Sequence, residues 1–548
     1  MEVSRTSKSP LLSPTPFQPF QKQLFRKMKK LAYIALVLVS LLSACTANFE
    51  EINSNPNAPE SVPGSLLLPT LIIEPAQMQG NLGWEDGNIS MQIVAVNNFT
   101  TFDQMGWGGQ SGVWNLLYRG IRDAQNLIDI AEESGNADYK AVALIIRAWM
   151  GGMLTDMFGD VPFSEANKAK DGNFTPSYDN QEDVYTAILA DLEEAADLLG
   201  TGSGISGDLL YSGNLDQWRK FANSLRIRYL MRLENKWGGS TVGAQIQQII
   251  DSEPVFETVE DGASVPYLAT APNQSPRHTG RVGGFDEQRL SQKAEERMKA
   301  IDDPRLFVYY RPIGNPDSLA AYFDANTLAQ LEAASGTGKT AYKDFFTGLY
   351  AEGPEAVRAY YPLFKGLPNG LSEGNAINYN GSRQNQSRLG EILRELPNGV
   401  SMHFMTYAEL QFILAEAAQK GYISGDAEVY YLAGIQAAMD MYGITPHESY
   451  YTQEGVALSD DSETALDQIA VQKWMSLFVA GFEAYFDWRR TGRPAIEPGP
   501  DNLNANRVPL RFVYPDDEQA LNSANWSTAV ERLGGQDEIN AVMWLLED

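Results

Sequence analysis

The sequence predicts an all-α protein whose helices form antiparallel pairs, separated by long irregular loops. Apolar residues recur at helical spacing in three windows of the chain, 112–157, 181–233 and 404–442. Turn-forming residues divide each window into two helical segments. A composition of 20% charged and 43% hydrophobic residues is that of a globular protein with a large core.

The N-terminal segment predicts export. Lys29 and Lys30 precede an almost wholly apolar run, 31–42, which is too short to span a bilayer. The run ends in Leu-Ser-Ala-Cys, which resembles a bacterial lipobox, and Cys45 is the only cysteine in the chain. We therefore expect cleavage before Cys45 and lipid attachment to its thiol. A plain signal peptide cleaved nearby is the alternative.

These features divide the chain into four predicted parts. Residues 1–27 are rich in serine and proline and do not fit a signal, so we expect the precursor to begin at Met28. Residues 28–44 form the predicted signal peptide, and 45–64 form a lipid anchor followed by an extended polar tether. The remainder, 65–548, is the predicted α-helical domain.

The helix pairs have the features of tetratricopeptide-like units. In the first pair, Leu117, Ile121, Ala124 and Ile128 share one helical face, and the turn at 134–136 separates this helix from its partner. Two antiparallel helices, a short turn and small residues where the helices cross are typical of such units, which stack into superhelical scaffolds. A strict repeat length is absent because long loops separate the pairs.

Two regions between the pairs are predicted as loops, 80–111 and 254–400. Both are rich in glycine, proline, asparagine and aromatic residues. Loops of this length are usually functional or disordered, and the aromatic content argues against disorder.

Several classes of function are disfavoured by composition and motif context. The formal net charge of −28 repels phosphate backbones, so no nucleic acid is expected as a partner. A single cysteine and three widely spaced histidines predict no metal site. Residues 333–340 resemble a phosphate-binding loop, but a helix rather than a strand is predicted before them.

Two other motifs favour a structural interpretation. Asp156 and Asp160 form a possible acid–base pair, but Gly159 and Pro162 mark the same segment as the end of a helix. The cationic run 488–494 has a phosphate or partner site as its functional alternative, although cations at a helix C-terminus are favourable by themselves. We therefore predict that the chain is not an enzyme.

Several blocks of the sequence, in order, resemble the SusD-like branch of the SusD/RagB family. They are FEEINSNPNAPESVPGSLLLP after the lipobox, LTDMFGDVPFSEA (154–166), QWRKFANSLRIRYLMRL (217–233), TYAELQFILAEAA (406–418), QKWMSLFVAGFEAYFDWRRTGRP (472–494) and RVPLRFVYPDDE (507–518). The resemblance implies a nutrient-binding lipoprotein anchored in the lipid of a Bacteroidetes-type outer membrane and facing the cell exterior. It also implies a partner, a SusC-like TonB-dependent transporter that receives bound oligosaccharide. Peptide cargo, as on the RagB side of the family, and a surface glycoside hydrolase are the alternatives.

The candidate ligand site combines the two loop regions. Trp84, Phe102 and Trp107 are predicted to offer stacking faces to sugar rings, with Asn375, Tyr379 and Arg383 as hydrogen-bond partners. Packing of these aromatic residues against the helical body is the alternative. No cofactor is expected apart from the covalent lipid at Cys45. The sequence does not decide whether a loop binds structural calcium.

Overall fold

The computed structural model describes residues 62–280 and 286–547. The predicted upstream extension, the signal peptide, Cys45 and the tether as far as residue 61 lie outside the described residues. From Pro63 onward the chain forms one compact unit.

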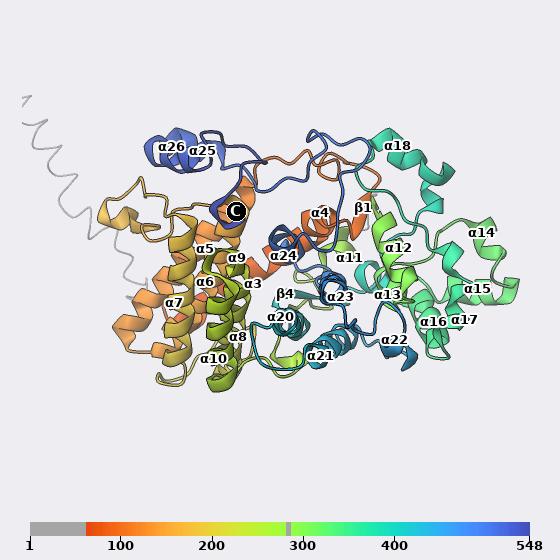
Figure 1. Cartoon of the computed structure of the whole chain (residues 1–548), viewed down its shortest axis with the longest axis horizontal. Helices are drawn as coiled ribbons and strands as arrows, with labels where there is room; N and C mark the ends of the chain where they lie inside the picture. Colours follow the sequence, from red (N-terminus) through yellow and green to blue (C-terminus); the bar gives the residue numbers. More distant parts are fainter. Residues whose placement is uncertain (1–61, 281–285, 548) are drawn as a thin grey trace, which may run out of the picture. The chain divides into compact units, whose positions relative to one another are not determined.

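The three predicted helix pairs are present at nearly the predicted positions. They are α5 (Ser111–Ser134) with α6 (Ala137–Phe158), α7 (Gln181–Leu198) with α8 (Leu215–Arg232), and α20 (Tyr407–Gln419) with α21 (Ala427–Asp440). Gly135 ends α5 in the left-handed conformation, and the Asn136 side chain caps α6 by accepting from the Asp138 N–H. Consecutive helices from α5 to α8 pack side by side, and α8 also packs on α20 (Figure 1). The prediction of an all-α fold is confirmed.

Glycines allow the helices of these pairs to cross closely. A Cβ atom on Gly120 of α5 would lie 2.4 Å from the Met150 sulfur of α6, and one on Gly152 of α6 would lie 2.2 Å from the Tyr229 hydroxyl of α8. Gly434 of α21 makes the same kind of approach to the ring of Phe412. Small residues are therefore required at these crossings, as the sequence predicts.

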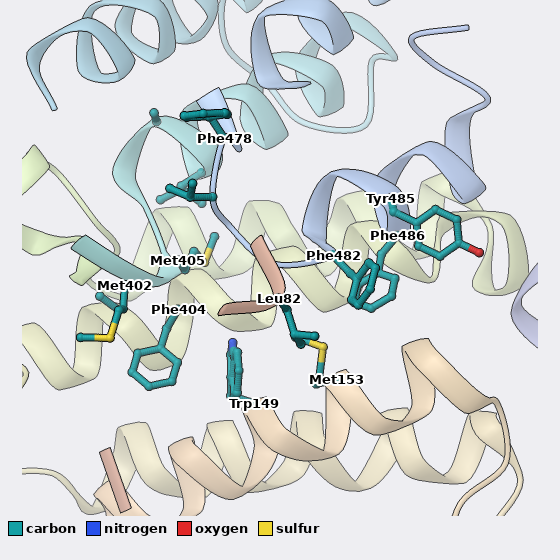
Figure 2. Packing of buried hydrophobic residues seen from close by; sticks show 14 of the residues in the cluster. Leu82, Trp149, Met153, Met402, Phe404, Met405, Phe478, Phe482, Tyr485 and Phe486 are labelled. Carbon is teal, nitrogen blue, oxygen red and sulfur yellow. The ribbon is translucent and has the colours of Figure 1, made fainter. Parts of the chain in front are cut away.

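Helix α6 lies at the centre of the apolar core. It is long and apolar enough to cross a membrane, but nearly all of it is buried within the fold. Trp149 packs edge-on against Phe404 with ring centroids 4.9 Å apart, and Met153 faces Leu82 and Phe482 (Figure 2). The core thus joins the helix pairs to segments from both the loop regions and the C-terminal part of the chain.

The loop regions contain more regular structure than predicted. Helix α3 (Gly64–Leu82) and the π-helix η1 (Gly83–Gly87) precede α4 (Asn88–Ser90), and two small antiparallel sheets follow. In these, β1 (Val94–Val96) pairs with β3 (Gln288–Leu290), and β2 (Ala263–Pro266) pairs with β4 (Ser401–Met405). The remaining α-helices are α9 (Glu234–Trp237), α10 (Gly239–Ser252), α11 (Pro276–Gly280), α12 (Gln292–Ala300), α13 (Leu306–Tyr309), α14 (Pro316–Ala320), α15 (Ala325–Ala333), α16 (Ala341–Tyr350), α17 (Pro354–Arg358), α18 (Glu373–Asn378), α19 (Glu391–Arg394), α22 (Ser449–Thr452), α23 (Ser462–Ser476), α24 (Glu483–Thr491), α25 (Asp516–Leu521) and α26 (Ser523–Arg532).

Segment 254–400 therefore contains more helices than its loop-rich sequence predicts, beyond the one expected before the 333–340 motif. Its helices are at most ten residues long and most are followed closely by glycine or proline, so each contributes too few turns for a periodic apolar pattern. Helix α15 ends at Ala333, the first residue of the 333–340 motif, and the Lys339 ammonium donates to the Ala333 carbonyl (2.8 Å). The motif is a helix C-terminus with a turn, as predicted from its context.

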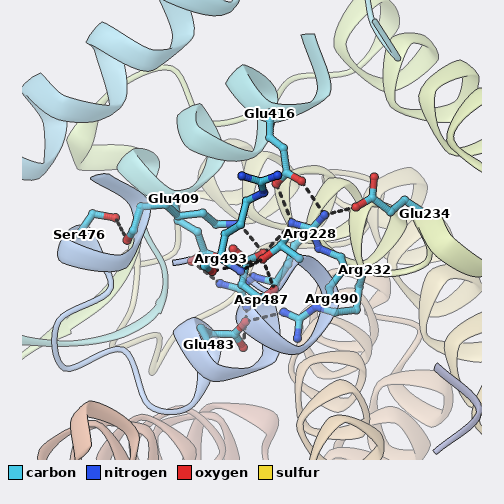
Figure 3. A network of polar contacts seen from close by, with 12 residues as sticks. Arg228, Arg232, Glu234, Glu409, Glu416, Ser476, Glu483, Asp487, Arg490 and Arg493 are labelled. Carbon is cyan, nitrogen blue, oxygen red and sulfur yellow. Dashed lines mark hydrogen bonds and ion pairs between the residues drawn. The ribbon is translucent and has the colours of Figure 1, made fainter. Parts of the chain in front are cut away.

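A network of buried charges fastens α24 to the helix pairs (Figure 3). The Arg490 guanidinium bonds to Glu416 of α20 (2.6 Å), Asp487 of α24 (2.8 Å) and Glu234 of α9, and its side chain is 2% exposed. Arg228 and Arg232 of α8 pair with further carboxylates beside it. Within the cationic run 488–494, the charge of Arg490 is therefore used in ion pairs inside the protein, which is the structural interpretation of the run.

Candidate ligand-binding surface

The structure brings the two predicted loop regions into direct contact. The Asn369 amide donates to the Val94 carbonyl (2.8 Å) and to a carboxylate oxygen of Asp103 (2.7 Å). A third segment completes the surface, because Asp501 accepts from the Ser372 N–H (2.7 Å) while its carbonyl accepts from Gln104 (2.7 Å). Segments 94–106, 369–388 and 501–503 thus form one continuous structure, which we call the loop surface.

Trp84 does not lie on the loop surface. It belongs to η1 and is 1% exposed, with its ring edge-on to Phe478 (6.5 Å) and 5.9 Å from the Arg277 guanidinium. Gly83 and Gly87 allow η1 to lie directly against the backbone of residues 479–481, which encloses the indole. The expectation that Trp84 is exposed in a loop is therefore wrong.

Trp107 is also buried, at 6% exposure. Its ring is stacked between Phe102 (centroids 4.7 Å apart) and Phe512 (5.0 Å), and its indole N–H donates to the Phe102 carbonyl (3.1 Å). Phe102 is half-buried in the same stack. These rings fix the loop to the helical body, so other aromatic rings cover both faces of Trp107 and one face of Phe102.

The three residues predicted from the later loop lie at the surface. Asn375 on α18 is exposed, and its amide donates to Asp501 (2.7 Å). Arg383 is exposed. Tyr379 is half-buried and packs against a small apolar cluster of Ala95, Leu367, Leu371 and Ala376, which links the two loops. Their contact with a ligand stays a prediction.

The comparisons with known proteins agree with this architecture. The model of a SusD-like family, described as starch-binding and associating with the outer membrane, matches residues 57–335 and 353–515. The chain belongs to this SusD-like family. The family is described by binding and not by catalysis, so the prediction that the chain is not an enzyme is confirmed. The family is also described as associating with the outer membrane, which agrees with the predicted location.

Solved structures of SusD homologues share the fold. A SusD homologue from Bacteroides fragilis is 26% identical with a TM-score of 0.69, and the match covers 89% of this chain and 100% of the other. An outer-membrane protein of Bacteroides vulgatus, proposed to take part in nutrient binding, is 26% identical with a TM-score of 0.73 and the same coverage. A chitin-binding SusD homologue from Flavobacterium johnsoniae, 22% identical over 88% of this chain and 98% of its own, shows the fold alone with a TM-score of 0.66. A search of curated proteins finds no match.

Within this SusD-like fold, the most exposed aromatic ring of the loop surface is Phe99, which sequence reasoning did not select. Its side chain is 73% exposed, its backbone has φ of +54°, and its N–H donates to Glu373 of α18 (3.3 Å). A positive φ is unfavourable for an aromatic residue, and such strain is found most often at binding sites. Leu503, 59% exposed, lies on the same surface against Gly106.

The sequence offered one weak indication of Phe99. It lies among the glycines and aromatics of region 80–111, but tryptophan offers a larger stacking face, and spacing in an irregular segment does not reveal which ring is exposed. Within residues 62–280 and 286–547, no group of three or more His, Cys, Asp or Glu side chains is arranged to hold a metal.

Proposed function

We propose that the protein binds oligosaccharides on its loop surface and delivers them to a SusC-like TonB-dependent transporter in the outer membrane. Lipid on Cys45 would hold it there, facing the cell exterior. The observation that carries the proposal is the strongly exposed Phe99 ring, whose backbone N–H donates to Glu373 in segment 369–388, a segment that also exposes Asn375 and Arg383. Family membership supports glycan as the cargo, because the family is described as starch-binding.

The chemistry of the loop surface suits a sugar chain. The C–H faces of a sugar stack on an aromatic ring, while amide and guanidinium groups meet its hydroxyls. Phe99 supplies the ring, and Asn375, Tyr379 and Arg383 supply polar groups from the facing segment. One stacked ring contributes about 1 kcal/mol, so binding by this chain alone is expected to be weak. Weak binding suits a protein that releases its cargo to a transporter, which adds further contacts.

The experiment is binding of a panel of oligosaccharides to the full chain and to two matched variants. Phe99→Ala removes the exposed ring of the loop surface, and Phe174→Ala removes a ring of similar exposure (77%) elsewhere. We expect Phe99→Ala to weaken glycan binding about fivefold, equivalent to ~1 kcal/mol, and Phe174→Ala to leave it unchanged. Both variants should keep the melting temperature of the wild type.

The same panel separates the alternatives. Retention of glycan without cleavage supports a binding protein, whereas release of shorter products would indicate a hydrolase. Retention of peptides but of no glycan would favour peptide cargo. Equal glycan affinity in the wild type and Phe99→Ala would place the site away from the loop surface.

A further inference from the structure

A cluster of arginines lies next to the loop surface. The Asp286 carboxylate is shared by the guanidinium groups of Arg394 (3.0 Å), Arg388 (3.1 Å) and Arg289 (3.6 Å). Arg383 lies close enough to repel the charge of Arg289. We call Arg289, Arg383, Arg388 and Arg394 the arginine cluster.

The backbone explains why these residues gather. Arg289 is the central residue of β3, where it pairs with Ala95 of β1 on one side and with Arg388 on the other. Arg388 and Arg383 belong to segment 369–388, and Ala95 belongs to segment 94–106. The arginine cluster is therefore held by two of the three segments that build the loop surface, 94–106 and 369–388.

Positive charge is in excess at this position. The pKa of Arg289 is lowered to about 10, chiefly by burial and also by repulsion from Arg388, Arg394 and Arg383, which together outweigh attraction by Asp286. Burial also lowers the pKa of Arg394, although Asp286 and Glu395 attract it. The arrangement is the reverse of that around Arg490, where one guanidinium meets three carboxylates.

Two members of the arginine cluster are accessible to a ligand. The Arg388 side chain is 39% exposed, and Arg383 is exposed. Guanidinium groups bind carboxylate and sulfate groups through paired N–H donors, which gives them both affinity and geometric selectivity. A formal net charge of −28 repels polyanions from most of the molecule, so an anionic ligand requires a local positive site.

We propose that the arginine cluster is an anion-binding subsite, which makes a negatively charged glycan the preferred cargo of the loop surface. The charged groups of that glycan are uronate carboxylates or sulfate esters. This inference rests on the proposed function, since it names the class of oligosaccharide that the same surface takes.

The test compares charged glycans with their uncharged counterparts on the full chain. Oligogalacturonate is paired with its methyl ester, and dextran sulfate is paired with dextran, so that the two pairs separate carboxylate from sulfate recognition. We expect at least one anionic member to bind ten times more tightly than its counterpart. That affinity should fall with added salt, whereas the affinity for neutral glycans should not.

Three variants assign the effect to the arginine cluster. Arg383→Gln and Arg388→Gln should each weaken binding of the anionic glycan about tenfold, and Arg383→Lys should retain most of it because the charge remains. The control is Arg122→Gln, whose side chain is 54% exposed. It belongs to α5, a helix that lies far from α18 in Figure 1. Because Arg383 is exposed, its replacement should leave the melting temperature unchanged.

The outcomes distinguish the two proposals. Equal binding of charged and uncharged counterparts, or wild-type affinity in both arginine-to-glutamine variants, overturns the anion-binding subsite while glycan binding stands. Binding of no glycan, charged or neutral, by the folded chain overturns the proposed function and this inference with it.

Discussion

At the scale of single residues, Trp107 and Phe99 lie eight positions apart and have opposite environments. Trp107 is enclosed by Phe102 and Phe512, so Trp107→Ala should leave a cavity and lower the free energy of unfolding by about 3–5 kcal/mol. Phe99→Ala should change it by less than about 0.5 kcal/mol because the ring is mostly in solvent. Urea denaturation of both variants measures the difference. Similar losses would mean that Trp107 is not an anchor of its loop.

Asp103, which links the two loops through Asn369, should make the free energy of unfolding depend on pH. Burial raises the pKa of Asp103 to about 7, although hydrogen bonds from Asn369 and Val96 favour the charged form. An unfolded aspartate loses its proton near pH 4, so the folded protein holds an extra proton between about pH 4 and 7. Protonation of Asp103 therefore stabilises the folded state at low pH, and this stabilisation is lost as the pH rises through this window.

Asp103→Asn removes this titration. We expect the free energy of unfolding of the wild type to fall more between pH 5 and pH 7.5 than that of the variant. Urea denaturation at the two pH values measures both slopes, and parallel slopes would contradict the prediction. The variant's stability at a single pH is not diagnostic, because asparagine also changes the hydrogen bonds to Asn369 and Val96.

Residue roles at the loop surface were only partly predictable. Asn375 and Arg383 are exposed, and Tyr379 is half-buried against Ala95 of the first loop. Glycines next to Trp84 and Trp107 suggested exposure, but Gly83 and Gly87 let the backbone around Trp84 pack against residues 479–481, and the rings of Phe102 and Phe512 cover Trp107. Contacts such as Trp107 with Phe512 join residues hundreds of positions apart, and no local pattern encodes them.

At the scale of elements, long helices were predictable and short ones were not. The pairs α5–α6, α7–α8 and α20–α21 contain enough turns for their apolar faces to be read from spacing. Helix α3 was missed even though it is 19 residues long, since Pro69 and Pro75 lie inside it and interrupt the expected pattern. Tertiary burial of its apolar residues outweighs the cost of these prolines.

The docking of α24 on α9 and α20 gives an element-scale prediction. Arg490→Met should leave Glu234, Glu416 and Asp487 without their shared buried cation and lower the free energy of unfolding by about 3–5 kcal/mol. The matched control is Arg493→Met, which removes pairs with the exposed carboxylates of Glu463 and Asp467 and should cost less than about 1 kcal/mol. Chemical denaturation of both variants is the measurement. Equal losses would show that the buried network does not fasten the helix.

At the scale of the whole molecule, the fold separates scaffold from binding surface. The helix pairs, the core around α6 and the buried charges form the scaffold, and segments 94–106, 369–388 and 501–503 lie on it as the loop surface (Figures 1–3). The aromatic stack of Trp107 connects the two. Glycan binding should therefore depend on the described unit that begins at Pro63, and attachment to the membrane should depend on Cys45.

This separation predicts that anchoring and binding can be lost independently. Cys45→Ala should abolish incorporation of labelled palmitate and move the protein from the membrane fraction to the soluble fraction, since the lipobox would lack its acceptor thiol. Thr46→Ala, next to the cysteine, is the matched control and should remain labelled and membrane-bound. The soluble Cys45→Ala protein should bind glycan with wild-type affinity, because all segments of the loop surface lie within the described unit. Continued labelling of Cys45→Ala would refute lipid attachment at this residue, and loss of glycan affinity in the folded variant would show that the anchor segment takes part in binding.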